Sequence, residues 1–464
     1  MKLIVGLALI LSALALEART FIVSAWRGET VAARVPDFAE LGAVPDGIKV
    51  RFGVLRPVKF APTPESMLRH EVYDRVEWGT DGEGPRVVEV SVPADTKPGT
   101  YACGAMTVRV VDRVLPPAKE WKYYLDLWQH PWAVARVAKA KPFSKEHYAA
   151  MRPVYELLAS AGQKTITVSL LEQPWDHQCR DAYHSMVDDA DFRTFDEYVQ
   201  FCLDCGLGPD ISCYSLCPWT LEQTIDEATM EKRWGGFLDR FAAHLRDKGW
   251  YGRTLMAMDE RSPEDVAKVV AFVRRHAPGL RISMAGNRKP SDFAGIDIDV
   301  YSQIIGHVTP DFLAEIPARR AKGFKTTHYV ACIPGRPNTF MDSADGEAFW
   351  LGASPAMLGL DGFLRWAWNS WPENPRRDAT YWCWRAGDTF LCYPGGEPSW
   401  RFLELRNGIV AAEKVRILKA SGLFAEELAK VAAMYKVSDA VSARSNFPAI
   451  RWATLEAVNR NGRQ

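Results

Sequence analysis

The sequence predicts three parts in order: an N-terminal β-sandwich, a (β/α)8 barrel of the TIM type, and a C-terminal helical segment. Three observations lead to this prediction. Short β-rich runs separated by turn residues fill the first quarter of the chain. From Trp121 on, apolar strands alternate with helical stretches, as in parallel-sheet proteins. From Trp400 on, only a helical spacing of apolar residues continues.

The N-terminal residues 1–18 are predicted to be a secretory signal peptide. Lys2 precedes a short apolar stretch, and the small residues Ala13 and Ala15 near its end form a cleavage-site pattern. The stretch is too short to span a bilayer, although an uncleaved anchor is the alternative. We therefore expect an exported protein, periplasmic or extracellular, without stable membrane insertion.

Residues 19–115 are predicted to form a β-sandwich of about seven strands. Runs at 21–23, 50–55 and 87–92 alternate in polarity or are rich in β-branched residues, and a Pro-Gly turn precedes a further strand pair at 105–111. Two prolines mark a linker before the next domain.

Residues 120–398 are predicted to form the barrel. Its strands are expected at 123–128, 165–171, 211–216, 255–260, 281–285, 296–304, 325–333 and 362–370. Helical patterns at 146–161, 194–206, 228–248 and 263–276 separate the first five of them. A doubly wound open sheet is the alternative, but no Gly-rich nucleotide loop follows the first strand. Residues 399–464 are expected to be helical and to pack on the barrel.

Composition limits the partners. Lys plus Arg and Asp plus Glu are equal at 57, so charge predicts neither nucleic acid nor an anionic membrane as a partner. The 17 Trp residues could supply flat platforms for sugars, although core packing is the commoner role for any one of them. A neutral or weakly charged substrate fits best.

Nine cysteines are an awkward number for an exported protein. Cys202 and Cys205 form a C-x-x-C pattern, and Cys213 and Cys217 follow at a wider spacing. A zinc site is conceivable, but buried free thiols are the favoured interpretation. No metal and no cofactor are expected.

Asp259 and Glu260 are the strongest functional signal. They end the apolar run of the fourth barrel strand, and catalytic groups of such barrels lie at the carboxyl ends of strands. Two adjacent carboxyls suit acid/base chemistry because one can hold a proton while its neighbour stays charged. The alternative is an exposed salt-bridge pair, with Glu172 and Asp176 as reserve acids.

Other strand ends contribute aromatic and amide side chains, which is what a saccharide site needs. The candidates for substrate binding are Trp128, Tyr214, Trp219, Tyr301, Tyr329, Trp368, Asn369 and, in a loop, His184. Trp368 is preferred for stacking, with Trp366 as the alternative, and only one of the two is expected to face the barrel interior. Asn369 is a candidate to bind a hydroxyl group, with a turn-forming role as its alternative.

Six motifs in order carry a family resemblance: LDLWQ at 125–129, AGQKTIT at 161–167, CYS at 213–215, MDE at 258–260, WAWNSWP at 366–372, and AGDTF at 386–390 with YPG at 393–395. Together they resemble glycoside hydrolase family 123 over about residues 120–420. The sandwich, with its KPGTY turn at 97–101, is also similar to that family's. One position departs from the pattern, because Ser212 stands where the family carries an amide.

The resemblance implies an exo-acting, retaining β-N-acetylgalactosaminidase. The 2-acetamido oxygen of the sugar would attack the anomeric carbon and form an oxazolinium intermediate. By the same analogy, Glu260 would act as acid and base, and Asp259 would hold the acetamido N–H. Tyr301 and Tyr329 are candidates to donate to the acetamido carbonyl. The implied substrate is a glycan with a terminal N-acetylhexosamine.

The spacing of the two acids is compatible with these roles. Ordinary retaining enzymes place two carboxyls about 5–5.5 Å apart across the anomeric carbon. Neighbouring residues of a regular strand point to opposite faces, so this pair needs the backbone to turn out of the strand. Proximity of like charges would then raise the pKa of one acid. A glycosidase of another glycan using the same acids, and a catalytically silent glycan-binding protein, are the alternatives.

Overall fold

The structure is a computed structural model, and it describes residues 20–36, 42–62, 66–79, 82–170, 191–214, 216, 226–293 and 295–461. The chain groups into two compact units. The first contains Val76–Pro117 together with the chain before Pro57 and the chain end from Asn459. The second contains Pro57–Arg75 and Ala118–Val458.

Seven β-strands precede the barrel in the described residues: β1 (Phe21–Arg27), β2 (Thr30–Arg34), β3 (Lys49–Phe60), β4 (His70–Trp78), β5 (Arg86–Ser91), β6 (Gly99–Cys103) and β7 (Met106–Val114). They form a three-stranded sheet in the order β1-β7-β6 and a four-stranded sheet in the order β2-β5-β3-β4. The last residues of β3, from Pro57, and the first residues of β4, up to Arg75, belong to the second unit.

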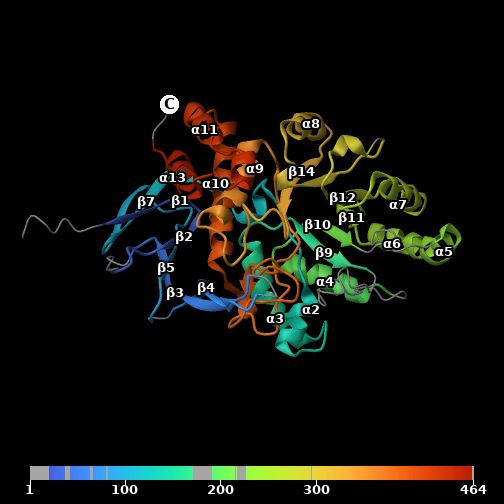
Figure 1. Cartoon of the computed structure of the whole chain (residues 1–464), viewed down its shortest axis with the longest axis horizontal. Coiled ribbons are helices and arrows are strands. Elements are labelled where there is room, and N and C mark those ends of the chain that lie inside the picture. Colours follow the sequence, from blue (N-terminus) through green and yellow to red (C-terminus); the bar gives the residue numbers. More distant parts are fainter. Residues whose placement is uncertain are drawn as a thin grey trace, which may run out of the picture. The chain divides into compact units, whose positions relative to one another are not determined.

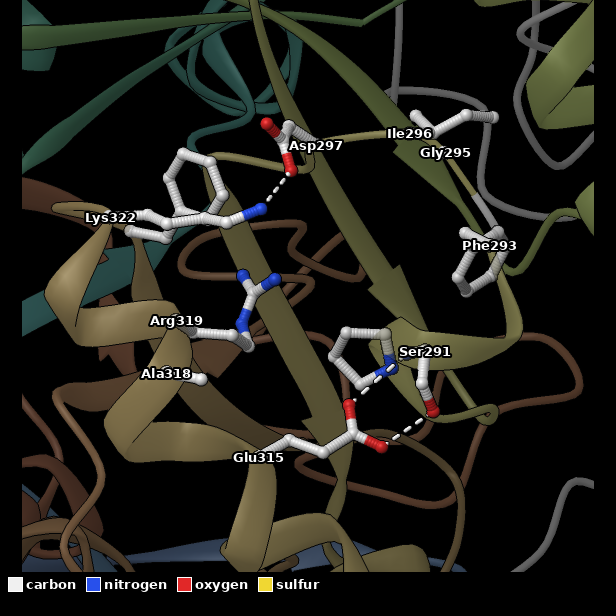
Figure 2. Close-up of a pocket in the computed structure, with 11 residues that line it drawn as sticks. Ser291, Phe293, Gly295, Ile296, Asp297, Glu315, Ala318, Arg319 and Lys322 are labelled. Carbon is white, nitrogen blue, oxygen red and sulfur yellow. Dashed lines mark hydrogen bonds and ion pairs between the residues drawn. The ribbon is translucent and has the colours of Figure 1, made fainter.

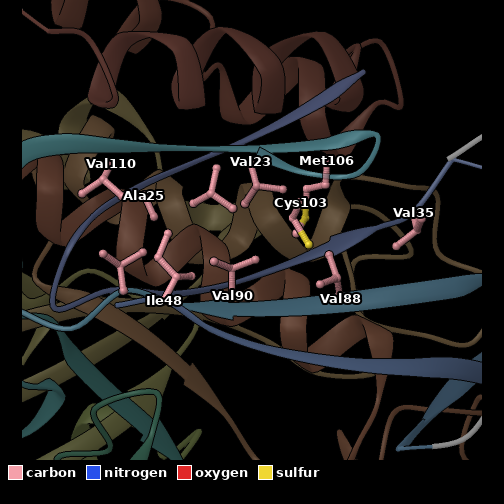
Figure 3. Packing of buried hydrophobic residues seen from close by; sticks show 11 residues of the cluster. Val23, Ala25, Val35, Ile48, Val88, Val90, Cys103, Met106 and Val110 are labelled. Atoms are coloured by element: carbon pink, nitrogen blue, oxygen red, sulfur yellow. The ribbon is translucent and has the colours of Figure 1, made fainter. Parts of the chain in front are cut away.

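The core of the first unit lies between these two sheets. Every second residue of a strand points inward, and the inward positions are apolar: Val23 and Ala25 on β1, Val88 and Val90 on β5, and Val108 and Val110 on β7. Figure 3 shows these side chains meeting in one cluster, with Cys103 and Met106 among them. The predicted β-rich N-terminal region is confirmed.

The second unit contains eight parallel strands that form a nearly closed barrel: β8 (Tyr124–Leu127), β9 (Thr165–Ser169), β10 (Asp210–Tyr214), β11 (Thr254–Asp259), β12 (Arg281–Gly286), β13 (Val300–Ile304), β14 (Lys325–Val330) and β15 (Gly362–Arg365). From β9 on, each strand pairs with the next in sequence, and β15 pairs with β8, so the sheet begins at β9 and ends at β8. All eight lie at the predicted positions, so the predicted TIM-type barrel is confirmed.

Polar side chains close the barrel where β8 meets β9. Backbone pairing there is reduced to one isolated bridge between Leu125 and Gln163 in the described residues. The Gln163 amide accepts from the Leu127 N–H at 3.0 Å, and Thr165 donates to the buried Asp126 carboxyl. Gln129 accepts from the Thr167 N–H at 2.8 Å. Side-chain hydrogen bonds therefore replace most of the backbone hydrogen bonds that β8 and β9 would otherwise form.

Helices cover the outside of the barrel (Figure 1). Those between strands are α2 (Pro131–Ala138), α3 (Lys145–Ala159), α4 (Arg193–Asp204), α5 (Glu227–Met230), α6 (Gly236–Asp247), α7 (Pro263–His276), α8 (Pro310–Ala321) and α9 (Glu347–Leu358). Those after β15 are α10 (Trp400–Ala420), α11 (Ala425–Ala432), α12 (Val437–Val441) and α13 (Phe447–Val458). No helix in the described residues is long and apolar enough to cross a bilayer.

One connection between barrel strands differs from the others. Every other strand-to-strand connection from β8 to β15 contains an α-helix in its described residues. Between β12 and β13 the described residues form only the 3-10 turn η5 (Pro290–Asp292). The outer helical layer of the barrel therefore has a gap beside α8.

Five of the seven described cysteines are buried, as the favoured interpretation expects, and two are exposed. Cys202 and Cys205, at the end of α4, are both buried and free. Burial raises the pKa of both thiols, which disfavours the thiolate that a metal would require. Cys332 and Cys383 are exposed.

Candidate active site

The two adjacent acids lie where β11 ends. Asp259 is the last residue of the strand, and it shares the inward face with Leu255 and Ala257. The Glu260 N–H still donates to the Ala285 carbonyl on β12 at 2.8 Å. Glu260 itself adopts the left-handed conformation, with φ of 47°.

This left-handed residue is what lets two consecutive side chains serve one site. In regular strand geometry Asp259 and Glu260 would point to opposite faces. The positive φ turns the chain out of the strand at Glu260. A side chain larger than glycine costs roughly 1–2 kcal/mol in this conformation. Backbone strain of this kind concentrates at functional sites.

Tyr329 joins the two acids from across the barrel. It lies on β14, and its hydroxyl donates to Glu260 Oε1 at 2.5 Å. Its side chain is 3% exposed, whereas Glu260 is exposed. Burial raises the pKa of Tyr329 far above its ordinary value, and the nearby charges of Asp259 and Glu260 add to that rise. Tyr329 therefore stays protonated and can only donate to these carboxylates.

An aromatic floor lies inside the barrel beneath the acids. One buried cluster combines side chains from the carboxyl ends of the strands: Trp128, Tyr214, Ala257, Ala285, Ile304, Tyr329, Leu364, Trp366 and Ala367. The rings of Trp128 and Tyr214 are 4.5 Å apart between centroids. The half-buried Tyr381 and Trp384 pack against this cluster, with Trp384 4.8 Å from Trp366. The structure thus places Trp128, Tyr214 and Tyr329 together, as predicted from their strand ends.

Trp366, rather than Trp368, belongs to this floor. Trp368 is fully buried, and its ring stands edge-on to Phe402 of α10 at 4.8 Å. Its ring therefore packs against α10 and does not belong to the cluster at the carboxyl ends of the strands. The indole N–H of Trp366 donates to Asp388 at 3.1 Å, and Arg365 also binds Asp388 at 2.7 Å. Asp388 therefore positions Trp366. The AGDTF motif at 386–390, which contains Asp388, is the sequence signal that could have identified this role.

Asn369 and Tyr301 also lie differently from their predicted roles. The Asn369 amide accepts from the His130 N–H and donates to the His130 carbonyl, both at 3.0 Å. It therefore fastens the chain after β8, and the side chain is fully buried there. Tyr301 points to the outer side of β13, and its hydroxyl donates to the Arg288 carbonyl. The period of two explains this, since Val300 and Ile304 occupy the inner face.

Two predicted contact residues, His184 and Trp219, lie outside the described residues. The same holds for the reserve acids Glu172 and Asp176. The described part of the site therefore consists of two acids, one phenol donor and an aromatic floor. Such a set can transfer a proton and can hold a sugar ring by its apolar face.

Comparison with known proteins agrees with this chemistry. The sequence model of the family "Glycoside hydrolase 123, catalytic domain" matches residues 128–418. A family 123 glycoside hydrolase from Clostridium perfringens has a similar structure, with a TM-score of 0.78 and 20% identity over 96% of each chain. A search among curated proteins gives no match.

More distant solved structures share little with the chain. An endo-β-1,4-mannanase from Thermotoga petrophila has a TM-score of 0.38 and 10% identity, covering 65% of this chain and 78% of its own. A GH53 catalytic domain from Ignisphaera aggregans has a TM-score of 0.37 and 13% identity, covering 64% and 99%. The family match extends over well more than half of the 464 residues. The chain therefore belongs to the glycoside hydrolase 123 family, and it is a glycosidase.

Proposed function

We propose that this glycosidase removes terminal β-linked N-acetylgalactosamine from glycans, acting from the chain end and with retention of configuration. The reaction is assisted by the substrate's own 2-acetamido group. Glu260 is the acid and base, and Asp259 orients the acetamido group. The Clostridium perfringens relative is described in terms of glycolipid glycan hydrolysis, which makes glycolipid glycans a candidate substrate class.

One observation carries this proposal: two consecutive acids emerge at one rim through a left-handed turn, with a buried tyrosine against the second. Two carboxylates that adjoin in sequence are poorly placed to flank an anomeric carbon from opposite sides. They are well placed to serve neighbouring atoms of the same ring. The nucleophile must then come from the substrate.

The proposed reaction has two steps. Glu260 donates its proton to the leaving oxygen while the acetamido carbonyl oxygen attacks the anomeric carbon and closes an oxazolinium ring. Asp259 accepts the acetamido N–H and stabilises the positive charge that develops there. Glu260 then takes a proton from water, which attacks the same carbon and reopens the ring. Two inversions leave the product in the β configuration.

Tyr329 is the proposed donor to the acetamido carbonyl. In the free enzyme its hydroxyl rests on Glu260. The same proton can turn to the substrate when the acetamido group arrives, and the buried ring holds the phenol at the rim in both states. The half-buried Trp384 supplies the apolar surface for the sugar, and Trp366 and Trp128 support it from beneath.

Three chromogenic substrates test the specificity: the β-N-acetylgalactosaminide, the β-N-acetylglucosaminide and the plain β-galactoside. We expect the first to be cleaved best and the last not at all, because it lacks the nucleophile. An oxazoline-mimicking thiazoline should inhibit competitively. Cleavage of the plain galactoside at a comparable rate would contradict substrate assistance, and would favour a glycosidase of another glycan that uses the same acids.

Glu260→Gln tests the acid. We expect kcat/KM for a poor leaving group to fall by about 10³-fold, within the range for loss of a general acid. An aryl leaving group that needs no protonation should lose far less. The matched control is Glu264→Gln, an exposed carboxyl of the first turn of α7, which should keep full activity. Equal losses with both leaving groups would remove Glu260 from the acid role.

We also propose that residues 1–18 direct export of the protein. These residues lie outside the described part of the chain. Mass spectrometry of the secreted protein's N-terminus would test the proposal, with a mature start near residue 19 as the expected result.

A further inference from the structure

We propose that a cavity on the outer wall of the barrel, beside α8, is a second glycan-binding site that takes an acidic sugar. Its volume is about 580 Å³, which is typical of a small-molecule site. Residues around η5 and from α8 line it (Figure 2). The site is separate from Asp259 and Glu260, which lie at the end of β11 inside the barrel.

The cavity exists because the outer helical layer is incomplete. The connection from β12 to β13 contains no α-helix in its described residues, only the turn η5. Side chains that a helix would otherwise cover therefore border the cavity. These include Phe293 from the connection and Phe324, which follows α8.

Arg319 lines this cavity and is the observation that points to a ligand. Its residue is only 9% exposed. Nε donates to the Thr326 hydroxyl at 2.9 Å, and Nη2 donates to the Ile298 carbonyl at 2.8 Å. All of its hydrogen-bond acceptors in the described residues are neutral, and no carboxylate there lies within ion-pair distance of it. A buried cation without a counterion is costly, so an anion in the cavity would be favourable.

The two acids of the cavity are already engaged elsewhere. Asp297 pairs with Lys322 at 2.9 Å, and Glu315 accepts from the Ser291 hydroxyl at 2.6 Å and from its N–H at 3.1 Å. Figure 2 shows the Arg319 head between these two pairs. Burial lowers the pKa of Arg319, and nearby acids such as Glu315 only partly oppose that fall. These acids act on Arg319 only from beyond ion-pair distance in the described residues, so a ligand anion can supply the direct ion pair.

The shape and lining favour a sugar as the body of that ligand. Phe293, Ile296 and Phe324 offer apolar faces, while Ser291 and Lys322 offer hydrogen-bonding groups at the sides. An apolar face with polar edges matches a pyranose ring. Nε and Nη2 of Arg319 already donate to neutral acceptors in the described residues, so Nη1 is the nitrogen that can donate to an oxygen of a carboxylate or sulfate group. Glycans that carry uronic acids or sulfated sugars supply both.

Binding of free sugars to the full-length protein tests the proposal by calorimetry. The probes are glucuronate, glucose 6-sulfate, neutral glucose and acetate, none of which carries the 2-acetamido group of the proposed substrate. We expect the two acidic sugars to bind at least about tenfold more tightly to this cavity than acetate. The stronger of the two identifies carboxylate or sulfate as the preferred group. No binding of either acidic sugar at 10-millimolar concentration, roughly the weak limit for free sugars, would overturn the proposal.

Two matched variants locate the binding. Ala318→Trp fills the cavity from an exposed position of α8 and leaves the hydrogen bonds of Arg319 in place. Ala314→Trp adds the same bulk to an exposed position of the same helix that does not line the cavity. Glucuronate binding should be lost in the first and kept in the second. Binding that survives Ala318→Trp would place the sugar elsewhere and overturn the proposal.

Arg319→Lys tests the role of the guanidinium. Lysine keeps the positive charge but lacks the planar fork, so we expect about tenfold weaker glucuronate binding. A melting temperature close to that of the parent protein shows that the fold is intact. If that variant unfolds early, Ala318→Trp still decides the question, since it leaves Arg319 unchanged. Because the readout is binding and not turnover, it does not depend on the proposed reaction.

Discussion

At the residue scale, the site depends on the conformation of Glu260. The left-handed backbone lets its side chain share a rim with Asp259, and the Tyr329 hydroxyl then meets it from β14. The conformation costs free energy that glutamate cannot recover locally. Interactions with the surrounding barrel have to offset this cost, in part the hydrogen bond from the Glu260 N–H to the Ala285 carbonyl.

Glu260→Asn should therefore be more stable than Glu260→Gln, although both remove the charge. Asparagine adopts positive φ more readily than glutamine does. We expect a difference of about 0.5–1 kcal/mol in the free energy of unfolding, measured by urea denaturation. Both variants should be inactive toward poor leaving groups. Equal stability of the two would mean that the backbone is not strained in solution.

Tyr329→Phe should lower kcat/KM by about 10- to 100-fold, since it removes a hydrogen bond to a charged group at the rim. Tyr301→Phe is the matched control. It deletes the same hydroxyl on the neighbouring strand β13, where that group binds the Arg288 carbonyl outside the barrel interior. Activity should stay close to the parent level in the control. Similar losses in both variants would point to a structural effect of either change.

At the element scale, α9 and α10 meet through two glycines. A Cβ atom on Gly352 would lie 2.4 Å from the Leu405 carbonyl oxygen, and one on Gly408 would lie 2.2 Å from the Phe349 carbonyl oxygen. Backbone cannot move aside as a side chain can. The contact brings α10, the first helix after β15, tightly against α9.

Gly352→Ala should destabilise the protein by about 2–3 kcal/mol, because the two helices have to separate. Gly236→Ala is the matched control, since the nearest atom to its added Cβ is a flexible Arg240 nitrogen at 3.8 Å. Alanine is the better helix former, so the control should be as stable as the parent protein or slightly more so. Thermal unfolding followed by circular dichroism gives both values. A neutral Gly352→Ala would show that the helices part without cost.

At the scale of the whole molecule, two buried groups set opposing pH dependences. Burial raises the pKa of Asp126, at the seam of the barrel, to about 7. The folded state binds this proton more tightly than the unfolded state does. The resulting stabilisation is fully present below about pH 4 and is lost as pH rises through 7. Burial lowers the pKa of His328 to about 3. Its contribution is present above about pH 6.5 and is lost as pH falls toward 3.

Asp126→Asn should leave the pH dependence of stability that His328 alone produces. In the parent protein the two contributions oppose each other between pH 4 and 6.5, and each amounts to up to about 4–5 kcal/mol. Without Asp126, stability should fall more steeply on acidification from pH 7 to pH 4. His328→Gln should do the reverse, with stability rising on acidification. Urea denaturation at several pH values measures the slopes, and parallel slopes in all three proteins would contradict this account.

Much of the architecture follows from local patterns. All eight barrel strands and the helices α3, α4, α6, α7 and α10 lie where apolar periodicity predicts them. The reason is that burial on both faces makes each parallel strand a continuous apolar run. The division into domains at residues 115, 120 and 398 stays a prediction. The compact units divide the chain differently, since Pro57–Arg75 groups with the barrel.

By itself, the sequence determined the barrel, the family and the acid pair, because strand periodicity and short motifs are local properties. Only the tertiary structure decided which side chains meet. On a regular strand Trp366 and Trp368, two residues apart, would share a face. β15 ends at Arg365, and beyond it Trp366 joins the interior cluster while Trp368 packs on Phe402 of α10. The tertiary structure also decided that Tyr329, and not Tyr301, contacts the acids, and that Glu260 is left-handed. Contacts between strands far apart in the sequence impose both.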